Sequence, residues 1–385
     1  MLLVEKIRMN ACFNPDLGKL TGIMCEKLKT QLQRYNGKYP AACSINGAYP
    51  LTDNTDWTPG FWSGMTWLGW QMTGDVFFLQ HLQQQLPGYG NRVQTRHDTQ
   101  THDLGFLYSL SCVNLWRSTG DNYARQSALQ AAELLAARYH PAARIIQAWG
   151  DLQDPQQQGR MIVDCMMNLP LLYWASEQTG DRRYAQMAHQ HASSACDHLI
   201  RSDFSTFHTF YMDVVSGKPL KGTTHQGYAD DSCWARGQAW ALYGFTLSYS
   251  YTGERRLLEA AKETARYFIR HLPADSICCW DLHLTAPETA KDSSAAAIAV
   301  CGLLELAKQL SVLDPDYEYF NRQALRIMTQ LCDRYFDSQV EDNGYLLHAV
   351  YNMNKGRGVD EYCIWGDHFF FEAVSRLTTP SAKYW

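Results

Sequence analysis

Apolar and polar positions along the chain alternate in helix-length blocks that a recurring turn separates. The triplet Thr-Gly-Asp occurs at 73–75, 119–121 and 179–181, and Thr-Gly-Glu occurs at 252–254. Each triplet follows an apolar, aromatic-rich segment, and all but the first precede an amphipathic one, such as YARQSALQAAELLAARY. Glycine adopts the left-handed conformation that ends a helix, and an acidic residue after it caps the next helix. Each triplet therefore predicts a helical hairpin.

These hairpins predict a closed ring of helices. The motif LDPD at 313–316 predicts a fifth turn, and helices are expected over 17–35 and 361–377. These segments give about twelve helices, in an apolar inner series and a more polar outer series. Strand signals are few and short. Turn spacings of 46, 60 and 73 residues are too irregular for a thin solenoid. We expect an all-α fold, an (α/α)6 barrel that forms one domain over 1–385. Separate helical domains are the alternative, although no Pro/Gly/Ser linker divides the chain.

The predicted barrel has two different ends. All the Thr-Gly turns lie where inner helices end, so the N-terminal ends of the inner helices gather at the opposite end. Long loops over one end of a rigid scaffold are where binding sites usually form. We expect the functional site at that end, because long polar insertions precede the inner helices at 88–102, 140–163, 201–232, 272–291 and 337–360.

Composition narrows the class of partner. Hydrophobic residues make up 46% of the 385 positions and charged residues 19%, as in a folded protein. A net charge of −5 and a pI near 6.2 argue against nucleic-acid and anionic-membrane partners, while a local cationic pocket for a small anion stays possible.

No apolar run approaches the roughly 20 residues of a membrane span, and the start of the chain reads as neither signal peptide nor anchor. The 12 cysteines lack metal-ligand spacing, so we expect free thiols in a reducing cytoplasm and no metal site.

Three aspartates stand where inner helices are expected to begin. Asp103, Asp164 and Asp292 could each be a helix cap, which is a common position for aspartate. Asp164 differs because the apolar run Cys-Met-Met follows it and would desolvate it. Desolvation raises the pKa of a carboxyl group and suits it to donate a proton near neutrality. Two carboxyl groups on neighbouring inner helices are the minimum for acid/base chemistry on a sugar.

The 33 residues from His208 to Trp240 concentrate aromatic rings, amides and a guanidinium. The tryptophans could stack on pyranose rings or fill the barrel core. Arg236, in an apolar helix, needs an anion, which could be a substrate carboxylate or a structural aspartate. Helical spacing predicts that Trp234 and Arg236 point in different directions. His189-Gln190-His191 is expected to be exposed rather than metal-binding.

Five segments carry a resemblance to a known family. They are HDLGF at 102–106, VDCMMNLPLLYWAS at 163–176, FHTFYMD at 207–213, THQGYADDSCWARGQAWALYG at 224–244 and GVDEYCIWGDHFFFEA at 358–373. Together they resemble the unsaturated glucuronyl hydrolases of glycoside hydrolase family 88 over nearly the whole chain. The motif RGQAW at 236–240 favours this group over the related unsaturated rhamnogalacturonyl hydrolases, in which RGN is more common.

The resemblance implies a cytoplasmic enzyme, monomeric or homodimeric, that acts without metal or organic cofactor on unsaturated uronic-acid-containing oligosaccharides left by polysaccharide lyases. Such enzymes hydrate the C4=C5 double bond of the terminal sugar, after which the hemiketal opens and the linkage breaks. By resemblance, Asp164 is the general acid and Asp103 the second carboxylate. The positions implied to surround the substrate are Trp57, Phe61, His102, Trp149, His208, Gln226, Trp234, Arg236 and Trp240.

Some alternatives stay open at this point. Family members that favour sulfated substrates carry serines and a lysine before GVDE, whereas this chain has Lys355 and Arg357 there. These two cations are either substrate contacts or part of a solvated loop. The competing functions are an unsaturated rhamnogalacturonyl hydrolase, an N-acyl-sugar 2-epimerase, for which inner histidine pairs would be expected, and a non-catalytic carbohydrate-binding protein.

Overall fold

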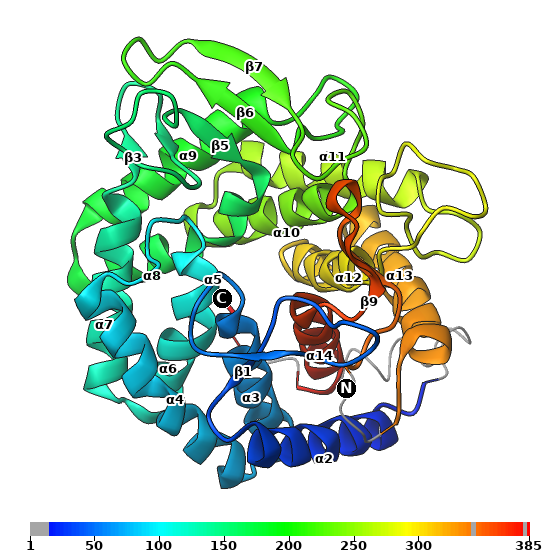
Figure 1. Cartoon of the computed structure of the whole chain (residues 1–385). Coiled ribbons are helices and arrows are strands. Elements are labelled where there is room, and N and C mark those ends of the chain that lie inside the picture. The colour runs from blue at the N-terminus through cyan, green and yellow to red at the C-terminus, as the bar shows by residue number, and fades with distance from the viewer. Residues whose placement is uncertain (1–14, 340–343, 380–382) are drawn as a thin grey trace.

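The helices form two concentric layers in the computed structural model, which describes residues 15–339, 344–379 and 383–385 (Figure 1). The inner layer consists of α3 (Pro59–Thr73), α5 (Leu104–Tyr108) with its continuations η1 (Ser109–Val113) and α6 (Asn114–Thr119), η2 (Val163–Met167) with α8 (Pro170–Thr179), α10 (Ala235–Thr252), α12 (Ser293–Lys308) and α14 (Ile364–Thr378). The outer layer consists of α2 (Leu17–Tyr35), α4 (Val76–Thr95), α7 (Asn122–Ala136), α9 (Arg182–His198), α11 (Arg255–Arg270) and α13 (Pro315–Gln330), which continues into η3 (Leu331–Tyr335).

The inner helices contact one another in chain order and close a ring. The last of them, α14, packs against α12 on one side and against α3 on the other. The outer helix α2 covers α14, so the sixth hairpin joins the first described helix to the last. This arrangement confirms the predicted (α/α)6 barrel. The predicted boundaries 17–35 match α2, and the last helix begins three residues later than expected.

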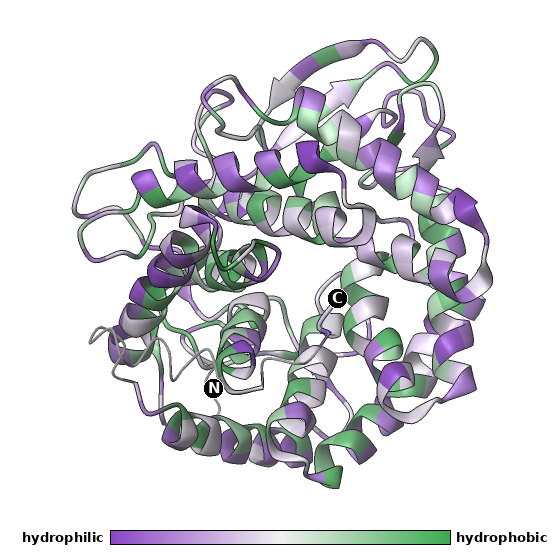
Figure 2. Ribbon diagram, turned by 180° about the vertical axis from the view of Figure 1, so that it is seen from behind, coloured by the Kyte–Doolittle hydropathy of each residue, from purple (hydrophilic) through white to green (hydrophobic). Residues whose placement is uncertain are grey.

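Burial separates the two layers as the pattern of apolar residues predicts. Every residue of α10 from 235 to 248 is buried, whereas α11 buries only one stripe of its surface. Figure 2 shows polar residues on the outward faces of the outer helices and apolar residues on the inner layer. An amphipathic outer helix and an all-round apolar inner helix are what a double ring requires. The hydrophobic core therefore lies between the layers and along the barrel axis.

The Thr-Gly turns have the predicted backbone. Gly74, Gly120, Gly180 and Gly253 have φ between 67° and 76°, the left-handed region that ends a helix. The acidic residues that follow the first three glycines accept a backbone N–H of the next helix through their side chains. Glu254 makes no such capping bond, so at the fourth turn this part of the prediction is wrong.

The other end of the barrel carries irregular loops and short antiparallel strands. Three of the strands form one sheet in the order β5-β6-β7, which lies over the start of α10 (Figure 1). We call the end where the inner helices begin the pocket end. Its strands are β1 (Tyr39–Pro40), β2 (Leu51–Thr52), β3 (Tyr139–His140), β4 (Ile145–Ile146), β5 (Arg160–Ile162), β6 (Thr209–Met212), β7 (Pro219–Thr223), β8 (Ala349–Asn352) and β9 (Arg357–Glu361), with the short helix η4 (Met353–Lys355) between the last two.

A buried network of charges crosses the barrel further along the axis. Arg376 of α14 binds Glu372 at 2.8 Å and Glu305 of α12 at 2.6 Å. The C-terminus lies inside the ring (Figure 1), and Nε1 of Trp385 donates to Glu372 at 3.1 Å. We call Glu305, Glu372 and Arg376 the axial ion cluster. It ties two neighbouring inner helices together.

The cysteines and the helix lengths can be compared with the predictions. Eleven cysteines have free thiols, and Cys12 lies outside the described residues, as does most of the start of the chain. No described helix is both long enough and apolar enough to cross a bilayer. No group of three potential metal ligands occurs within the described ranges.

Candidate active site

A pocket of about 350 Å³ opens at the pocket end, between the starts of the inner helices. Cavities of a few hundred Å³ are the usual size for small-ligand sites. Eight of the residues predicted for the site line it, together with two that were not predicted. The lining residues are Trp57, His102, Asp103, Trp149, Asp164, His225, Gln226, Trp234, Arg236 and Tyr351.

Asp164 lies in η2, at the inner end of the pocket. Its Oδ1 is buried and has no hydrogen-bond partner among the described residues. Burial is the main cause that raises the pKa of Asp164 to about 7; the nearby Asp103 contributes to this rise, and Arg236 opposes it. A neutral carboxylic acid is therefore well populated near pH 7, and the residue that carries it lines the pocket. The side chain caps no helix, so the capping interpretation is wrong for Asp164.

Asp103 lies beside it but has more partners. Its Oδ2 accepts the hydroxyl of Thr101 at 2.7 Å, and its Oδ1 lies 3.3 Å from Nε2 of His102. Burial raises the pKa of Asp103 to about 6, and the Thr101 hydrogen bond opposes this rise. Asp103 precedes α5 without capping it by its side chain, which leaves the carboxyl group turned to the pocket. Asp103 is the more acidic member of the pair.

The side chain of Asn168 joins the segment that carries Asp103 to the segment that carries Asp164. Its Oδ1 accepts the N–H of Phe106 at 2.7 Å, and its Nδ2 donates to the carbonyl of Asp164 at 3.2 Å. The same side chain also hydrogen-bonds Asp103. Gly105 permits this approach, because a Cβ there would stand 2.3 Å from the Cα of Asn168. One buried amide thus connects the starts of two inner helices.

Arg236 is buried and fully engaged by protein atoms. Its Nη1 binds Asp292 at 2.9 Å and the Val350 carbonyl at 2.6 Å, while its Nη2 binds Gln226 Oε1 and the Tyr351 carbonyl, each at 2.7 Å. The anion that this arginine needs is therefore a structural aspartate. Asp292 also accepts the N–H of Ala295 and so is the one true cap of the three aspartates.

The orientation predicted for Trp234 is wrong. Trp234 is the residue before α10 and not part of the helix, so its ring folds back over the guanidinium of Arg236, at 4.4 Å. Trp365 lies on another side of the same guanidinium, at 4.9 Å. The cation thus fixes two tryptophans, and Trp365 in turn stacks on Trp57 at 5.1 Å.

His208 lies directly behind the pocket wall. Its Nδ1 accepts the backbone N–H groups of His225 at 2.9 Å and Gln226 at 3.1 Å, so the ring proton is on Nε2. Burial lowers the pKa of His208 well below its ordinary value. His102 is also neutral, since burial lowers its pKa to about 3. Both histidines are therefore uncharged at neutral pH. His208 holds the backbone of the pocket wall, and His102 lies beside Asp103.

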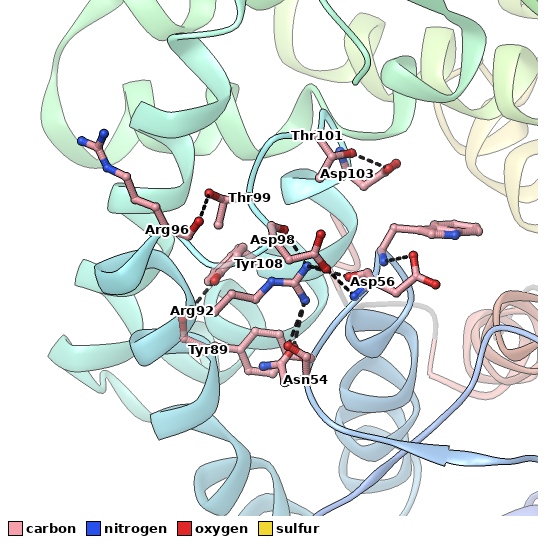
Figure 3. Close-up of polar contacts among 11 residues, drawn as sticks. Asn54, Asp56, Tyr89, Arg92, Arg96, Asp98, Thr99, Thr101, Asp103 and Tyr108 are labelled. Atoms are coloured by element: carbon pink, nitrogen blue, oxygen red, sulfur yellow. Dashed lines mark hydrogen bonds and ion pairs between the residues drawn. The ribbon is translucent and has the colours of Figure 1, made fainter. Parts of the chain in front are cut away.

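A second arginine fixes the loops from which Trp57 and Asp103 project. Figure 3 shows the Arg92 guanidinium between the segment at Asn54 and Asp56 and the segment at Asp98. It donates to the carbonyls of Asp56 at 2.6 Å and Asp98 at 2.8 Å. The two loops precede α3 and α5, so one buried cation helps to set the width of the pocket.

Four predicted substrate contacts are not in the pocket lining, in addition to His208. Phe61 and Trp240 are buried in the core, where both pack on Phe106 at 5.1 and 5.2 Å. Lys355 and Arg357 are exposed on the β8–β9 hairpin at the edge of the pocket. The guanidinium of Arg357 lies 4.5 Å over the ring of Tyr351.

Two lining residues were missed. Tyr351 accepts a hydrogen bond from Trp57 Nε1 at 3.3 Å, and His225 is exposed with its ring 5.5 Å from that of Trp149. His225 stands beside Gln226, and this adjacency was the available signal. His191, predicted to be exposed, is buried and accepts the N–H of Ile146.

Comparisons with known proteins agree with this geometry. Residues 30–367 match the sequence family described as Glycosyl Hydrolase Family 88. The chain is 42% identical over 371 residues to the unsaturated glucuronyl hydrolase of Bacillus sp. (strain GL1), covering 96% of this chain and 97% of the relative. It is 38% identical over 372 residues to the unsaturated chondroitin disaccharide hydrolase of Streptococcus pneumoniae (strain ATCC BAA-255 / R6), covering 96% and 94%.

Solved structures show the same architecture. The crystal structure of unsaturated glucuronyl hydrolase from Bacillus sp. GL1 has a TM-score of 0.92 at 41% identity, over 94% of this chain and 97% of that one. A variant of the Streptococcus agalactiae enzyme, complexed with dGlcA-GalNAc6S, has a TM-score of 0.86 at 35% identity, over 96% and 93%.

Proposed function

Because the chain belongs to Glycosyl Hydrolase Family 88, we propose that its pocket releases the terminal 4,5-unsaturated uronic acid from glycosaminoglycan-type oligosaccharides made by lyases. The observation that carries this proposal is a pair of partly buried carboxyl groups that share one pocket and have raised pKa values. An ordinary pair of surface carboxylates would both be ionised near pH 7. Here one of them can hold a proton that no protein partner takes up.

The first step uses that proton. The C4=C5 bond of the substrate is an enol ether, and its π electrons attack the acidic hydrogen of Asp164 to form a C4–H bond. Positive charge then develops at C5 and on the ring oxygen. The ionised carboxylate of Asp103, in the same cavity, favours this charge. The raised pKa of Asp164 supports its assignment as the general acid rather than as the ionised partner.

The second step adds water at C5. The Asp164 carboxylate, having given up its proton, accepts one from the attacking water, and a hemiketal forms. The hemiketal opens by breaking the bond between C5 and the ring oxygen. The anomeric carbon is then a hemiacetal, which releases the remaining oligosaccharide as an alcohol. Proton and electron counts balance without a metal or a redox cofactor.

The walls of the pocket supply orientation. Trp57, Trp149 and Trp234 offer flat apolar surfaces for sugar rings, and Gln226 is held by Arg236 through its carbonyl oxygen, which leaves its amide N–H groups for a substrate. We assign Arg236 a positioning role, because its donors bind Asp292 and main-chain carbonyls. The closed ring supports a single catalytic domain. The free thiols support a reducing compartment such as the cytoplasm.

The test follows the substrate's own chromophore. The conjugated enol ether absorbs near the ultraviolet edge, and we expect this absorbance to decay when the enzyme is added to unsaturated chondroitin, hyaluronan or heparin disaccharides. A pectin-derived unsaturated disaccharide serves as the comparison substrate. Decay confined to the pectin-derived compound would transfer the activity to the rhamnogalacturonyl group. Binding without decay of any member of the panel would show a non-catalytic protein.

A further inference from the structure

A row of cations and rings leads away from the pocket across the β5–β6–β7 sheet. Arg160 on β5 pairs with Tyr211 on β6, which pairs with Lys221 on β7. Directly paired residues of neighbouring strands lie on the same face of a sheet. The three side chains therefore form one surface, which we call the sheet face. It adjoins the pocket because the Arg160 guanidinium lies 4.9 Å over the ring of Trp149, a lining residue.

The guanidinium of Arg160 is held flat while its edge stays available. It lies between the rings of Trp149 and Tyr211, the latter at 5.5 Å, and its Nε donates to the Tyr211 hydroxyl at 3.2 Å. Stacking uses the face of a guanidinium, so the in-plane N–H groups of Nη1 and Nη2 are left for a planar or tetrahedral anion. A clamped arginine loses little further freedom on binding. This separates Arg160 from an ordinary surface cation.

No protein carboxylate neutralises the sheet face. Neither Arg160 nor Lys221 has a carboxylate within ion-pair distance in the described part of the chain, although the protein as a whole carries a net charge of −5. The neighbouring His225 is affected by the positive charge of these side chains. Burial lowers the pKa of His225, and Lys355 and Arg160 lower it further. Positive potential is therefore concentrated at the exposed side of the pocket.

The path of a substrate points in this direction. The unsaturated sugar must reach Asp103 and Asp164, which are partly buried in the lining of the pocket. The rest of the oligosaccharide has to leave by the open side, where Trp149 is partly exposed and His225 is exposed. The ring of Trp149 can support the sugar after the cleaved linkage, and the sheet face comes next.

We propose that the sheet face of Arg160, Tyr211 and Lys221 is a further subsite, which binds an acidic group of the oligosaccharide beyond the cleaved linkage. The group is a carboxylate or a sulfate, since both present oxygens to a guanidinium edge in the same way. The subsite rests on the proposed function for the position of the unsaturated sugar. It makes the enzyme select chains that carry acidic groups on the released side.

The experiment compares three unsaturated substrates. They are an unsulfated chondroitin disaccharide, the same disaccharide with a sulfate on its second sugar, and an unsulfated hyaluronan tetrasaccharide, whose third sugar carries a carboxylate. For Arg160→Gln we expect the kcat/KM of at least one acidic substrate, relative to the unsulfated disaccharide, to fall about tenfold, as for the loss of one charge-assisted hydrogen bond. A fall for the sulfated disaccharide identifies sulfate, and a fall for the tetrasaccharide identifies carboxylate.

Two further variants separate charge from fold. Arg160→Lys keeps the charge without the planar fork and is expected to give an intermediate ratio. Arg182→Gln removes the same charge from an exposed position at the start of α9, at the opposite end of the barrel, and is expected to leave all ratios unchanged. Unchanged ratios for Arg160→Gln would overturn the proposal. A parallel loss on all three substrates would also overturn it, since that would show a structural role.

A binding measurement keeps the subsite distinct from the proposed function. In the Asp164→Asn background, calorimetry with the tetrasaccharide and the sulfated disaccharide reads the sheet face without turnover. We expect Arg160→Gln to raise Kd about tenfold for the same acidic substrate that it affects in turnover. If the protein with Asp164 intact hydrolysed none of the three substrates while Arg160→Gln still weakened binding, the proposed function would be rejected and the subsite kept. Equal Kd values with and without Arg160 would reject the subsite alone.

Discussion

Two buried groups of charges on the inner helices behave in opposite ways. In the axial ion cluster, burial alone would raise the pKa of Glu372, but Arg376, the nearby His368 and the hydrogen bond from Tyr243 lower it to about 2. In the pocket, the pKa values of Asp103 and Asp164 are raised to about 6 and about 7. The glutamates of the axial ion cluster are buried and the two aspartates only partly so, and yet the pKa values of the aspartates are the raised ones. The difference is what surrounds them.

The contrast shows that the partners of the neighbouring arginine, more than depth of burial, decide whether the pKa of such a carboxyl group is raised or lowered. Arg376 gives its donors to Glu305 and Glu372. Arg236 gives its donors to Asp292 and to neighbours in the pocket wall, and it opposes the rise in the pKa of Asp164 only through space. A salt bridge between Arg236 and Asp164 would lower the pKa of Asp164 and remove its protonated form near neutral pH. Asp292 prevents this by holding the arginine.

The largest expected effect is that of Asp164→Asn. It removes the transferable proton and should lower kcat by about a thousandfold, within the usual range for a general acid. Because the folded-state pKa of Asp164 lies above its ordinary value of 3.8, the folded state binds more protons between these values, and this residue's contribution makes wild-type stability fall as pH rises from about 4 to 7. Urea unfolding should show that the variant lacks this part of the decline. Activity within tenfold of wild type would contradict the assignment.

Breaking the axial ion cluster should lower stability and leave activity nearly unchanged. Arg376→Met leaves two buried carboxylates without their cation and should lower the free energy of unfolding by about 3–5 kcal/mol, as measured by urea denaturation. The kcat per folded molecule should change less than threefold, since the pocket lies at another level of the barrel. The exposed Arg255→Met serves as the control for loss of charge alone. Lost activity with unchanged stability would show that the two groups are coupled.

A smaller effect is expected for Asp292→Asn, which loosens the partner of Arg236. The charge of Arg236 is then less offset, so the pKa of Asp164 should fall and the protonated fraction near neutrality should shrink. The alkaline limb of the pH–activity profile should move to lower pH, with about threefold less activity at pH 7. A profile of unchanged shape with uniformly lower activity would show that Asp292 acts through the fold alone.

The smallest effect should come from a Thr-Gly turn. Asp121 caps α7 through the N–H of Ala124 at 3.0 Å. Asp121→Ala should lower the free energy of unfolding by about 1 kcal/mol and leave kcat and KM unchanged, because this turn lies at the opposite end of the barrel. Asp121→Asn, which keeps a capping oxygen, is the matched control. A change in KM would show that the two ends are not independent.

The fold followed from the sequence because its signals are local. A Thr-Gly-acid turn is three residues long, and the helices on either side reveal themselves by their own periodicity. The carboxyl pair was also accessible, since Asp103 and Asp164 each start an inner helix. What the sequence could not supply were long-range partners. The contact between Arg236 and Asp292 joins two helix starts, and the stacking of Trp234 on Arg236 depends on the backbone before α10.

The assignments of Phe61 and Trp240 show a related limit. A tryptophan in the core and one in a sugar site have the same sequence signal, because both require a large apolar surface. Only the direction of the side chain separates Trp240, which packs on Phe106 and Phe369, from Trp234, which lines the pocket. Tyr351 was missed because it lies in a short strand of a loop and not at a helix start.

The stacking of Trp57 on Trp365 has a consequence for biosynthesis. These two rings meet across more than 300 positions of sequence, and the barrel cannot close until α14, which begins at Ile364, has left the ribosome. Until then α3 and α12 of the emerging polypeptide each have an uncovered side, and the guanidinium of Arg236 lacks Trp365, one of the two tryptophans that pack on it. Such distant pairings form slowly. Newly made molecules should therefore need chaperone protection for most of their translation, and catalysis should start abruptly and late.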